Sequence, residues 1–64
     1  MFGYVTKDRN EEIYLHSEFP YYDNESGLWL STPEEIDITG KFSEFDSISY
    51  NDEPIKVEIK LERV

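Results

Sequence analysis

The 64-residue chain contains no cysteine and a single histidine, His16. Disulfide bonds are therefore excluded, and a structural zinc site built from Cys and His has no ligand set. A cysteine nucleophile is excluded as well. His16 lies in an alternating segment, on the opposite face from Ile13 and Leu15. We interpret it as a histidine at the solvent edge or partly packed, and we expect no catalytic residues in this chain.

Membrane and ligand motifs are also missing. No run approaches the roughly 20 apolar residues that cross a bilayer. Five of the six residues 7–12 are charged, which leaves no room for the apolar part of a signal peptide. The three glycines are isolated and form no phosphate-binding loop, and residues 23–27 lack the acidic pattern of a calcium loop. We expect a cytoplasmic protein without a cofactor, a metal or a membrane contact.

Basic side chains are scarce in the middle of the chain. Residues 10–54 contain twelve acidic residues and one basic residue, Lys41, and the formal net charge of the whole chain is −9. Because phosphate backbones would be repelled, direct binding to nucleic acid is not expected. Two interpretations of the acids remain open. They keep a small domain soluble, or they present an acidic surface to a basic partner.

Aromatic residues, by contrast, are plentiful. Four Phe, five Tyr and one Trp occur in the 64 residues. A chain of this length buries only about 60% of the surface that its unfolded form exposes. Aromatic side chains bury more area than aliphatic ones, so ten of them can support a small core. We therefore expect a folded domain that spans residues 1–64.

Alternation of apolar and charged residues predicts strands at both ends of the sequence. Residues 55, 57, 59 and 61 are apolar and residues 56, 58, 60 and 62 are charged, which is typical of a half-buried strand. Residues 2–7 and 12–17 alternate too, and the turn formers between them predict a hairpin. We also predict a second hairpin between residues 47–50 and 55–61, in which the far part of the last strand pairs with residues 2–6.

The middle of the sequence is less regular. Residues 18–27 are predicted to form a long connection, and residues 28–31 a short strand. Residues 32–35 have the signature of a helix start, Thr followed by Pro and Glu, but an alternating segment over 36–40 limits it to one turn before another short strand. Phe42 and Phe45 are three residues apart, which also suits a single helical turn.

The predicted fold class is all-β and mainly antiparallel. It is a small sheet or a partly open barrel of four to five short strands, with at most one helical turn. A sheet of this size without a covering helix must curl on itself or bury one face by dimerisation. A homodimer is therefore one expected state of the protein.

One stretch resembles a known group of proteins. Tyr50-Asn-Asp-Glu-Pro-Ile-Lys-Val-Glu-Ile59 is similar to the C-terminal segment of small, acidic, uncharacterised proteins of bacteriophages and prophages. The segments Ile13-Tyr-Leu15 and Gly27-Leu-Trp29 are similar to theirs as well, although that family usually has Trp where this chain has Tyr50. The resemblance implies a phage or prophage setting in the cytoplasm of a host cell. It implies no known activity, but small acidic proteins in such a setting often bind host proteins.

These observations predict a non-enzymatic accessory protein that binds a host or phage protein. The alternative is an acidic mimic of nucleic acid that inhibits a DNA-handling defence enzyme of the restriction or CRISPR type. A third hypothesis is an assembly role in which an exposed strand edge recruits another chain. Aromatic side chains in the 18–31 region either cover the open end of the core or form a contact surface. The candidate partner-binding residues are Phe19, Tyr21, Tyr22, Trp29, Glu34, Glu35 and Asp37.

Overall fold

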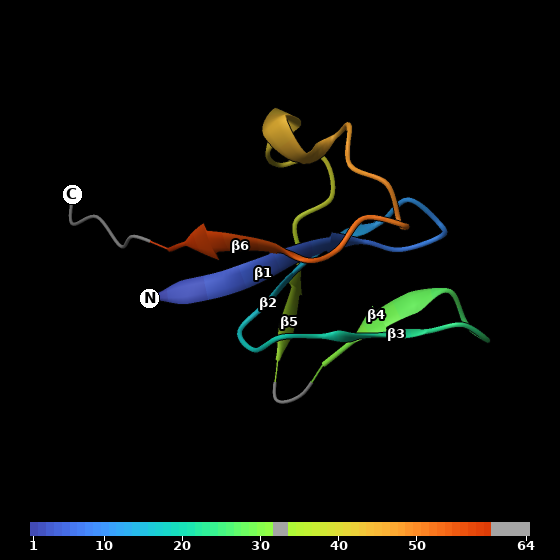
Figure 1. Ribbon diagram of the computed structural model, residues 1–64. Coiled ribbons are helices and arrows are strands. Elements are labelled where there is room, and N and C mark those ends of the chain that lie inside the picture. The colour runs from blue at the N-terminus through green and yellow to red at the C-terminus, as the bar shows by residue number, and fades with distance from the viewer. Residues whose placement is uncertain (32–33, 60–64) are drawn as a thin grey trace.

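The computed structural model describes residues 1–31 and 34–59, and in these residues it contains six strands and one 3-10 turn (Figure 1). A four-stranded antiparallel sheet has the order β5-β2-β1-β6, and β3 and β4 form a separate two-stranded sheet. Both sheets are open, which confirms the all-β prediction with one strand more than expected. The elements are β1 (Phe2–Lys7), β2 (Ile13–His16), β3 (Tyr21–Asp23), β4 (Leu28–Leu30), β5 (Glu35–Asp37), η1 (Ser43–Phe45) and β6 (Ile55–Glu58).

The predicted N-terminal hairpin is confirmed. β1 pairs with β2 in a register that sets Val5 opposite Leu15 and Tyr4 opposite His16. Because side chains alternate, Val5, Ile13 and Leu15 share one face of the sheet, called the apolar face below. Thr6 and His16 share the other face, called the hairpin face. In the turn, the Asp8 N–H donates to the Glu12 carbonyl at 2.8 Å.

The predicted C-terminal hairpin is wrong. Residues 47–50 form no strand because a local turn engages their backbone. The Ser49 N–H donates to the Asp52 carboxylate at 2.8 Å, and the Asp52 N–H donates to the Ser49 carbonyl at 3.0 Å. β6 pairs instead with β1 over its whole length, from Val5 opposite Ile55 to Phe2 opposite Glu58. The predicted pairing with residues 2–6 is therefore confirmed for residues 55–58, and residues 60 and 61 of the predicted strand lie outside the described part.

The core lies between the apolar face and the segment that follows β5. Val5, Ile13 and Ile38 are 1%, 3% and 7% exposed, and Phe45 and Ile48 pack against them. The segment arches over the sheet in Figure 1 and includes the 3-10 turn that the spacing of its two Phe residues predicted. The short strand predicted over residues 36–40 is present as β5 at Glu35–Asp37, so the prediction is confirmed for residues 36 and 37 and wrong for residues 38–40. Thr32 and Pro33 of the predicted helix start lie outside the described residues.

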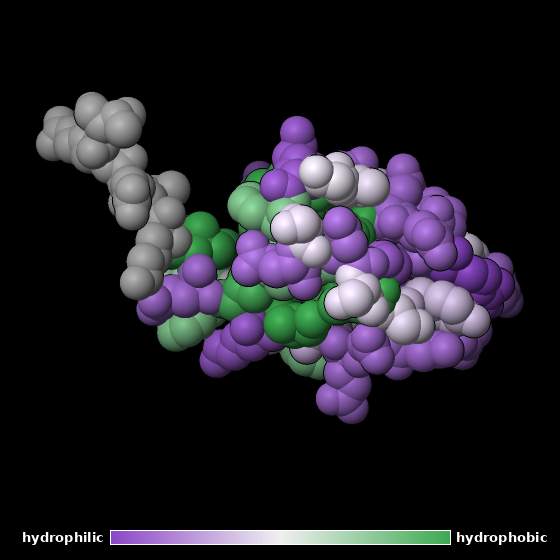
Figure 2. Space-filling view, turned by 90° about the horizontal axis from the view of Figure 1, so that it is seen from above, coloured by the Kyte–Doolittle hydropathy of each residue, from purple (hydrophilic) through white to green (hydrophobic). Residues whose placement is uncertain are grey.

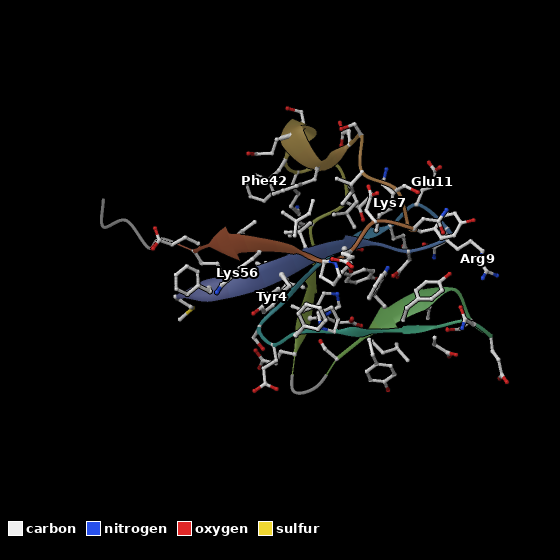
Figure 3. The ribbon with its side chains drawn as sticks, viewed as in Figure 1. Tyr4, Lys7, Arg9, Glu11, Phe42 and Lys56 are labelled. Atoms are coloured by element: carbon white, nitrogen blue, oxygen red, sulfur yellow. The ribbon has the colours of Figure 1, made fainter. Side chains whose placement is uncertain are left out.

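The β3–β4 hairpin covers the opposite face of the sheet (Figure 1). Polar groups attach it to the turn that follows β1. The buried Asp8 carboxylate accepts the Trp29 N–H at 2.8 Å, and the Arg9 N–H donates to the Gly27 carbonyl at 2.9 Å. Figure 3 shows Arg9 beside the tip of this hairpin. Residues 18–27 were predicted as a connection, so β3 was missed. Within the described residues, no helix is long and apolar enough to cross a membrane.

Candidate functional site

His16 is fully buried, with 0% of its surface exposed, so its predicted place at the solvent edge is wrong. Its Nε2 is hydrogen-bonded to the Thr6 hydroxyl at 2.8 Å and its Nδ1 to the Ser31 hydroxyl at 2.7 Å. Ser31 follows β4, so the hairpin seals the ring against the four-stranded sheet. No sequence pattern indicates that a second sheet covers this face, and the predicted position of His16 was wrong for that reason.

This histidine links the two sheets through a hydroxyl group on each side of its ring. The Glu35 carboxylate lies 3.6 Å from Nδ1, so a serine, a histidine and an acid do meet here. Both ring nitrogens, however, already have hydroxyl partners. Neither His16 nor Ser31 lines the two apolar hollows described below, and the ring itself is fully buried.

Burial lowers the pKa of His16 from its ordinary value of 6.5, because the charged ring would lose its hydration. The unfolded chain therefore binds more protons than the folded chain just below pH 6.5. We expect the stability that depends on His16 to be fully present above that pH. It should fall as the pH drops from 6.5 through the lower pKa of the folded state. Urea denaturation at a series of pH values from 7.5 to 5 measures this.

The variant His16→Gln is the control for that pH series. The chain contains one histidine, so the slope of stability against pH in this window should flatten even if Gln lowers the overall stability. Burial also raises the pKa of Asp8 and of Glu35. The stability that these two carboxyl groups contribute is lost as the pH rises, so their effect on the slope is opposite to that of His16. The variant keeps both carboxyl groups, so the difference between the two slopes belongs to His16. An unchanged slope would show that His16 does not cause the loss of stability below pH 6.5.

The predicted aromatic contact residues divide into packed and exposed side chains. Tyr22 and Trp29 lie opposite each other across β3 and β4, are half-buried, and have ring centroids 5.2 Å apart. Phe19 is 66% exposed, although its ring meets the Tyr4 ring edge-on at 5.2 Å, and Tyr21 is 65% exposed. Tyr22 and Trp29 thus pack against each other within the β3–β4 hairpin, while Phe19 and Tyr21 present apolar surface to solvent.

The three predicted acidic residues come together at one edge of the four-stranded sheet. Glu34 precedes β5, and Glu35 and Asp37 belong to it. β5 pairs with β2 on one side only, and no described strand lies on the other side. Hydrogen bonding to Thr39, from its hydroxyl and its backbone N–H, lowers the pKa of the Asp37 carboxyl. Asp37 therefore stays charged at neutral pH.

Sequence reasoning missed the apolar residue between these acids. Ile36 is 58% exposed on the apolar face, opposite Leu15. Ile36 and Leu15 line a hollow of about 210 Å³ together with Met1 and Ile59. A single apolar residue between two acids on a short strand is a signal of an edge strand, and it could have identified β5 as one.

A second hollow of about 350 Å³ lies farther along the same face, and Leu15 and Ile59 line both. It lies between the sheet and the segment after β5, from which Phe42 and Phe45 contribute. Figure 2 looks down on this side of the molecule and shows apolar residues open to solvent between polar ones. We call the two hollows together the apolar groove.

Within residues 1–31 and 34–59, no group of three or more His, Asp or Glu side chains is arranged to hold a metal ion. No family model, curated protein or solved structure matches this chain. The resemblance to small phage proteins therefore stays a prediction, and the function has to be argued from the geometry.

Proposed function

We propose that this protein is a non-enzymatic binding protein that holds a basic, extended segment of another protein against the β5 edge. The observation that supports this most strongly is the edge itself. All three residues of β5 are exposed, and carboxylates flank an exposed isoleucine. The resemblance to phage proteins suggests that the partner is a host or phage protein in the cytoplasm.

The direction of the backbone groups supports addition of a strand at this edge. The Ile38 N–H donates to the Ile13 carbonyl at 2.9 Å, so Ile38 and, two residues back, Ile36 point their backbone groups toward β2. The N–H and carbonyl groups of Glu35 and Asp37 consequently point away from the sheet. An incoming strand can hydrogen-bond to them, which is how extended peptides add to open sheets.

The side chains define the chemistry of such a segment. Glu35 and Asp37 lie on the hairpin face, where basic side chains of the partner would meet them. Ile36 lies on the apolar face next to the smaller hollow of the groove, where an apolar side chain would fit. A strand that alternates basic and apolar residues satisfies both faces, and opposite charges also speed the encounter.

The test is an NMR titration with a synthetic peptide that alternates Lys and Val. The backbone amide signals of Glu35 and Asp37 should shift more than those of β6. The double variant Glu35→Gln/Asp37→Asn should weaken binding roughly two- to thirty-fold, because two exposed ion pairs of about 0.2–1 kcal/mol each are lost. Glu25→Gln/Glu53→Gln removes the same charge from exposed positions elsewhere and should leave the affinity nearly unchanged.

The alternative function, mimicry of nucleic-acid charge to inhibit a DNA-handling defence enzyme, has one observation in its favour. Exposed acids occur on many parts of the molecule and not only at β5, including Glu18, Glu25, Glu44 and Glu53. A mimic depends on the summed charge, so both double variants would weaken binding to a basic enzyme equally, and added salt would abolish it. Equal weakening would therefore reject the β5 proposal and favour the mimic.

A further inference from the structure

The buried ring of His16 lies directly behind the β5 edge. His16 belongs to β2 and Glu35 to β5, and the two residues are opposite each other where these strands pair. The Glu35 Oε2 lies 3.6 Å from the His16 Nδ1, while 38% of the Glu35 side chain is exposed to solvent. The same side chain therefore borders a buried titratable ring and is also open to a partner at the edge of the sheet.

We propose that His16 is a positioning residue that acts through Glu35, and that protonation of its ring makes the β5 edge release a basic partner. This role of His16 rests on the proposed function of β5. With a neutral ring, the Glu35 carboxylate keeps its full negative charge for a basic side chain of the partner. With a protonated ring, a positive charge lies 3.6 Å from that carboxylate and competes with the partner for it.

The hydrogen bonds of the ring are compatible with both of its charge states. A hydroxyl group can donate or accept, so the hydroxyls of Thr6 and Ser31 can serve a neutral ring or, as two acceptors, a protonated one. Neither hydroxyl carries a charge that would compensate that of the imidazolium. The Glu35 carboxylate carries such a charge, so protonation of His16 should bind Glu35 to the ring while both hydroxyl contacts persist.

The remaining ionisable groups around the ring do not replace Glu35 in this role. They are Tyr4 of β1, opposite His16, Tyr14 of β2, Asp37 of β5, opposite Tyr14, Lys56 of β6, opposite Tyr4, and Asp8 of the turn after β1. From the β3–β4 side, the ring meets the uncharged Ser31. Burial and then the neighbouring acids raise the pKa of Tyr14, so this side chain is neutral at every pH of the test below.

Glu35 titrates as well, and its effect on binding has the same sign. Burial, and after it the charge of Asp8, raises the pKa of the Glu35 carboxyl. A protonated Glu35 attracts a basic side chain less, so acid weakens binding through Glu35 and through His16 together. Replacement of His16 separates the two contributions, because it leaves Glu35 in place.

The first measurement is the affinity for the peptide that alternates Lys and Val. NMR titrations run at constant ionic strength, from pH 7.5 down to the lowest pH at which the native amide signals persist. Over this range the affinity of the parent chain should fall roughly two- to fivefold more than that of His16→Gln, because the parent loses one exposed ion pair to the imidazolium. An equal fall in the two chains would reject control by His16.

The second measurement follows the ring itself and needs neither the peptide nor a variant of His16. The chain contains one histidine, so the Cε1–H signal belongs to His16. Glu35→Gln should lower the pKa of His16 below that of the parent chain, because the imidazolium loses its carboxylate. Asp37→Asn removes the same charge from the position opposite Tyr14 and should lower the pKa much less. Equal effects, or a native signal that does not move before the chain unfolds, would overturn the proposal.

The peptide titrations distinguish failure of the β5 function from failure of its control. A peptide that does not bind at pH 7.5 rejects β5 as a binding edge, and the pKa comparison then still measures the contact of His16 with Glu35. A peptide that binds at β5 with the same pH dependence in both chains leaves the function intact and rejects the role of His16. Because linkage is reciprocal, a saturating concentration of the peptide should itself lower the pKa of His16.

Discussion

Replacing Ile13 by alanine should remove a large part of the free energy of unfolding and bring the protein close to its unfolding midpoint at room temperature. Ile13 is 3% exposed and forms the core with Val5 and Ile38, and its backbone carbonyl accepts the Ile38 N–H. Truncation of a buried isoleucine costs about 2–5 kcal/mol, through lost burial and the cavity left behind. The lower bound of the usual total stability is about 5 kcal/mol, and domains this small are close to it.

The matched control is Ile36→Ala in the same sheet. Ile36 is 58% exposed, so the same truncation should change the free energy of unfolding by only a few tenths of a kcal/mol. Urea denaturation followed by circular dichroism measures both variants. Equal losses would mean that the apolar face is not the core side of the sheet. Ile36→Ala should still reduce the affinity for the alternating peptide, which separates stability from binding.

The second large effect is expected at the tip of the β3–β4 hairpin. Gly27 has a φ of 74°, a conformation that costs a residue with a side chain about 1–2 kcal/mol. A Cβ atom at this position would also lie 2.8 Å from the Arg9 Cβ, a contact too short to keep. Gly27→Ala should therefore strain the tip and push the hairpin away from the turn after β1. The lone tryptophan, Trp29, lies two residues away and should report the change in its fluorescence.

Gly40→Ala isolates the conformational part of that effect. Gly40 has a nearly identical φ of 73°, but no heavy atom lies within 4 Å of the place where its Cβ would be. Its substitution should cost only the conformational strain and leave the fluorescence of Trp29 unchanged. Thermal denaturation of the two variants should show the larger loss at Gly27. Equal losses of stability would mean that the Arg9 side chain moves away from the new Cβ without a cost in free energy.

The sequence predicted those strands whose apolar side chains point to one side only. β1, β2 and β6 alternate because one face meets the core and the other does not. The short β5 was found by the same pattern. The 3-10 turn followed from the spacing of Phe42 and Phe45. Alternation alone was insufficient in residues 47–50, because the Asp52 side chain competes for the backbone of Ser49, and such local competition does not show in a hydrophobic pattern.

The second sheet could not be predicted because its strands are held by long-range polar contacts. β3 has only three residues and stands between Pro20 and a run of turn formers, so it lacks a pattern of its own. Its position depends on the Asp8 carboxylate and on Ser31, which meet their partners across the fold. The burial of His16 follows from that sheet and was misjudged with it.

The candidate site was predicted in part. The acids Glu34, Glu35 and Asp37 were selected for their charge, and the structure collects them at one edge. Ile36 was overlooked because an isoleucine in an alternating segment is expected to be buried, and only the sheet order reveals that β5 has a neighbour on one side. The same order places β6 at the other end of the described sheet, which depends on which strand pairs with β1.

The pairing of β1 with β6 has a consequence for synthesis on the ribosome. β1 ends at Lys7, but the strand that completes its ladder begins only at Ile55. At typical elongation rates, the intervening chain takes roughly 2 to 10 seconds to make. During that time the nascent chain can form the β1–β2 hairpin but must leave one side of β1 uncovered. A newly made strand with an open side is a substrate for chaperones and for aggregation, so the yield of this protein in cells should depend on how quickly residues 8–54 are translated.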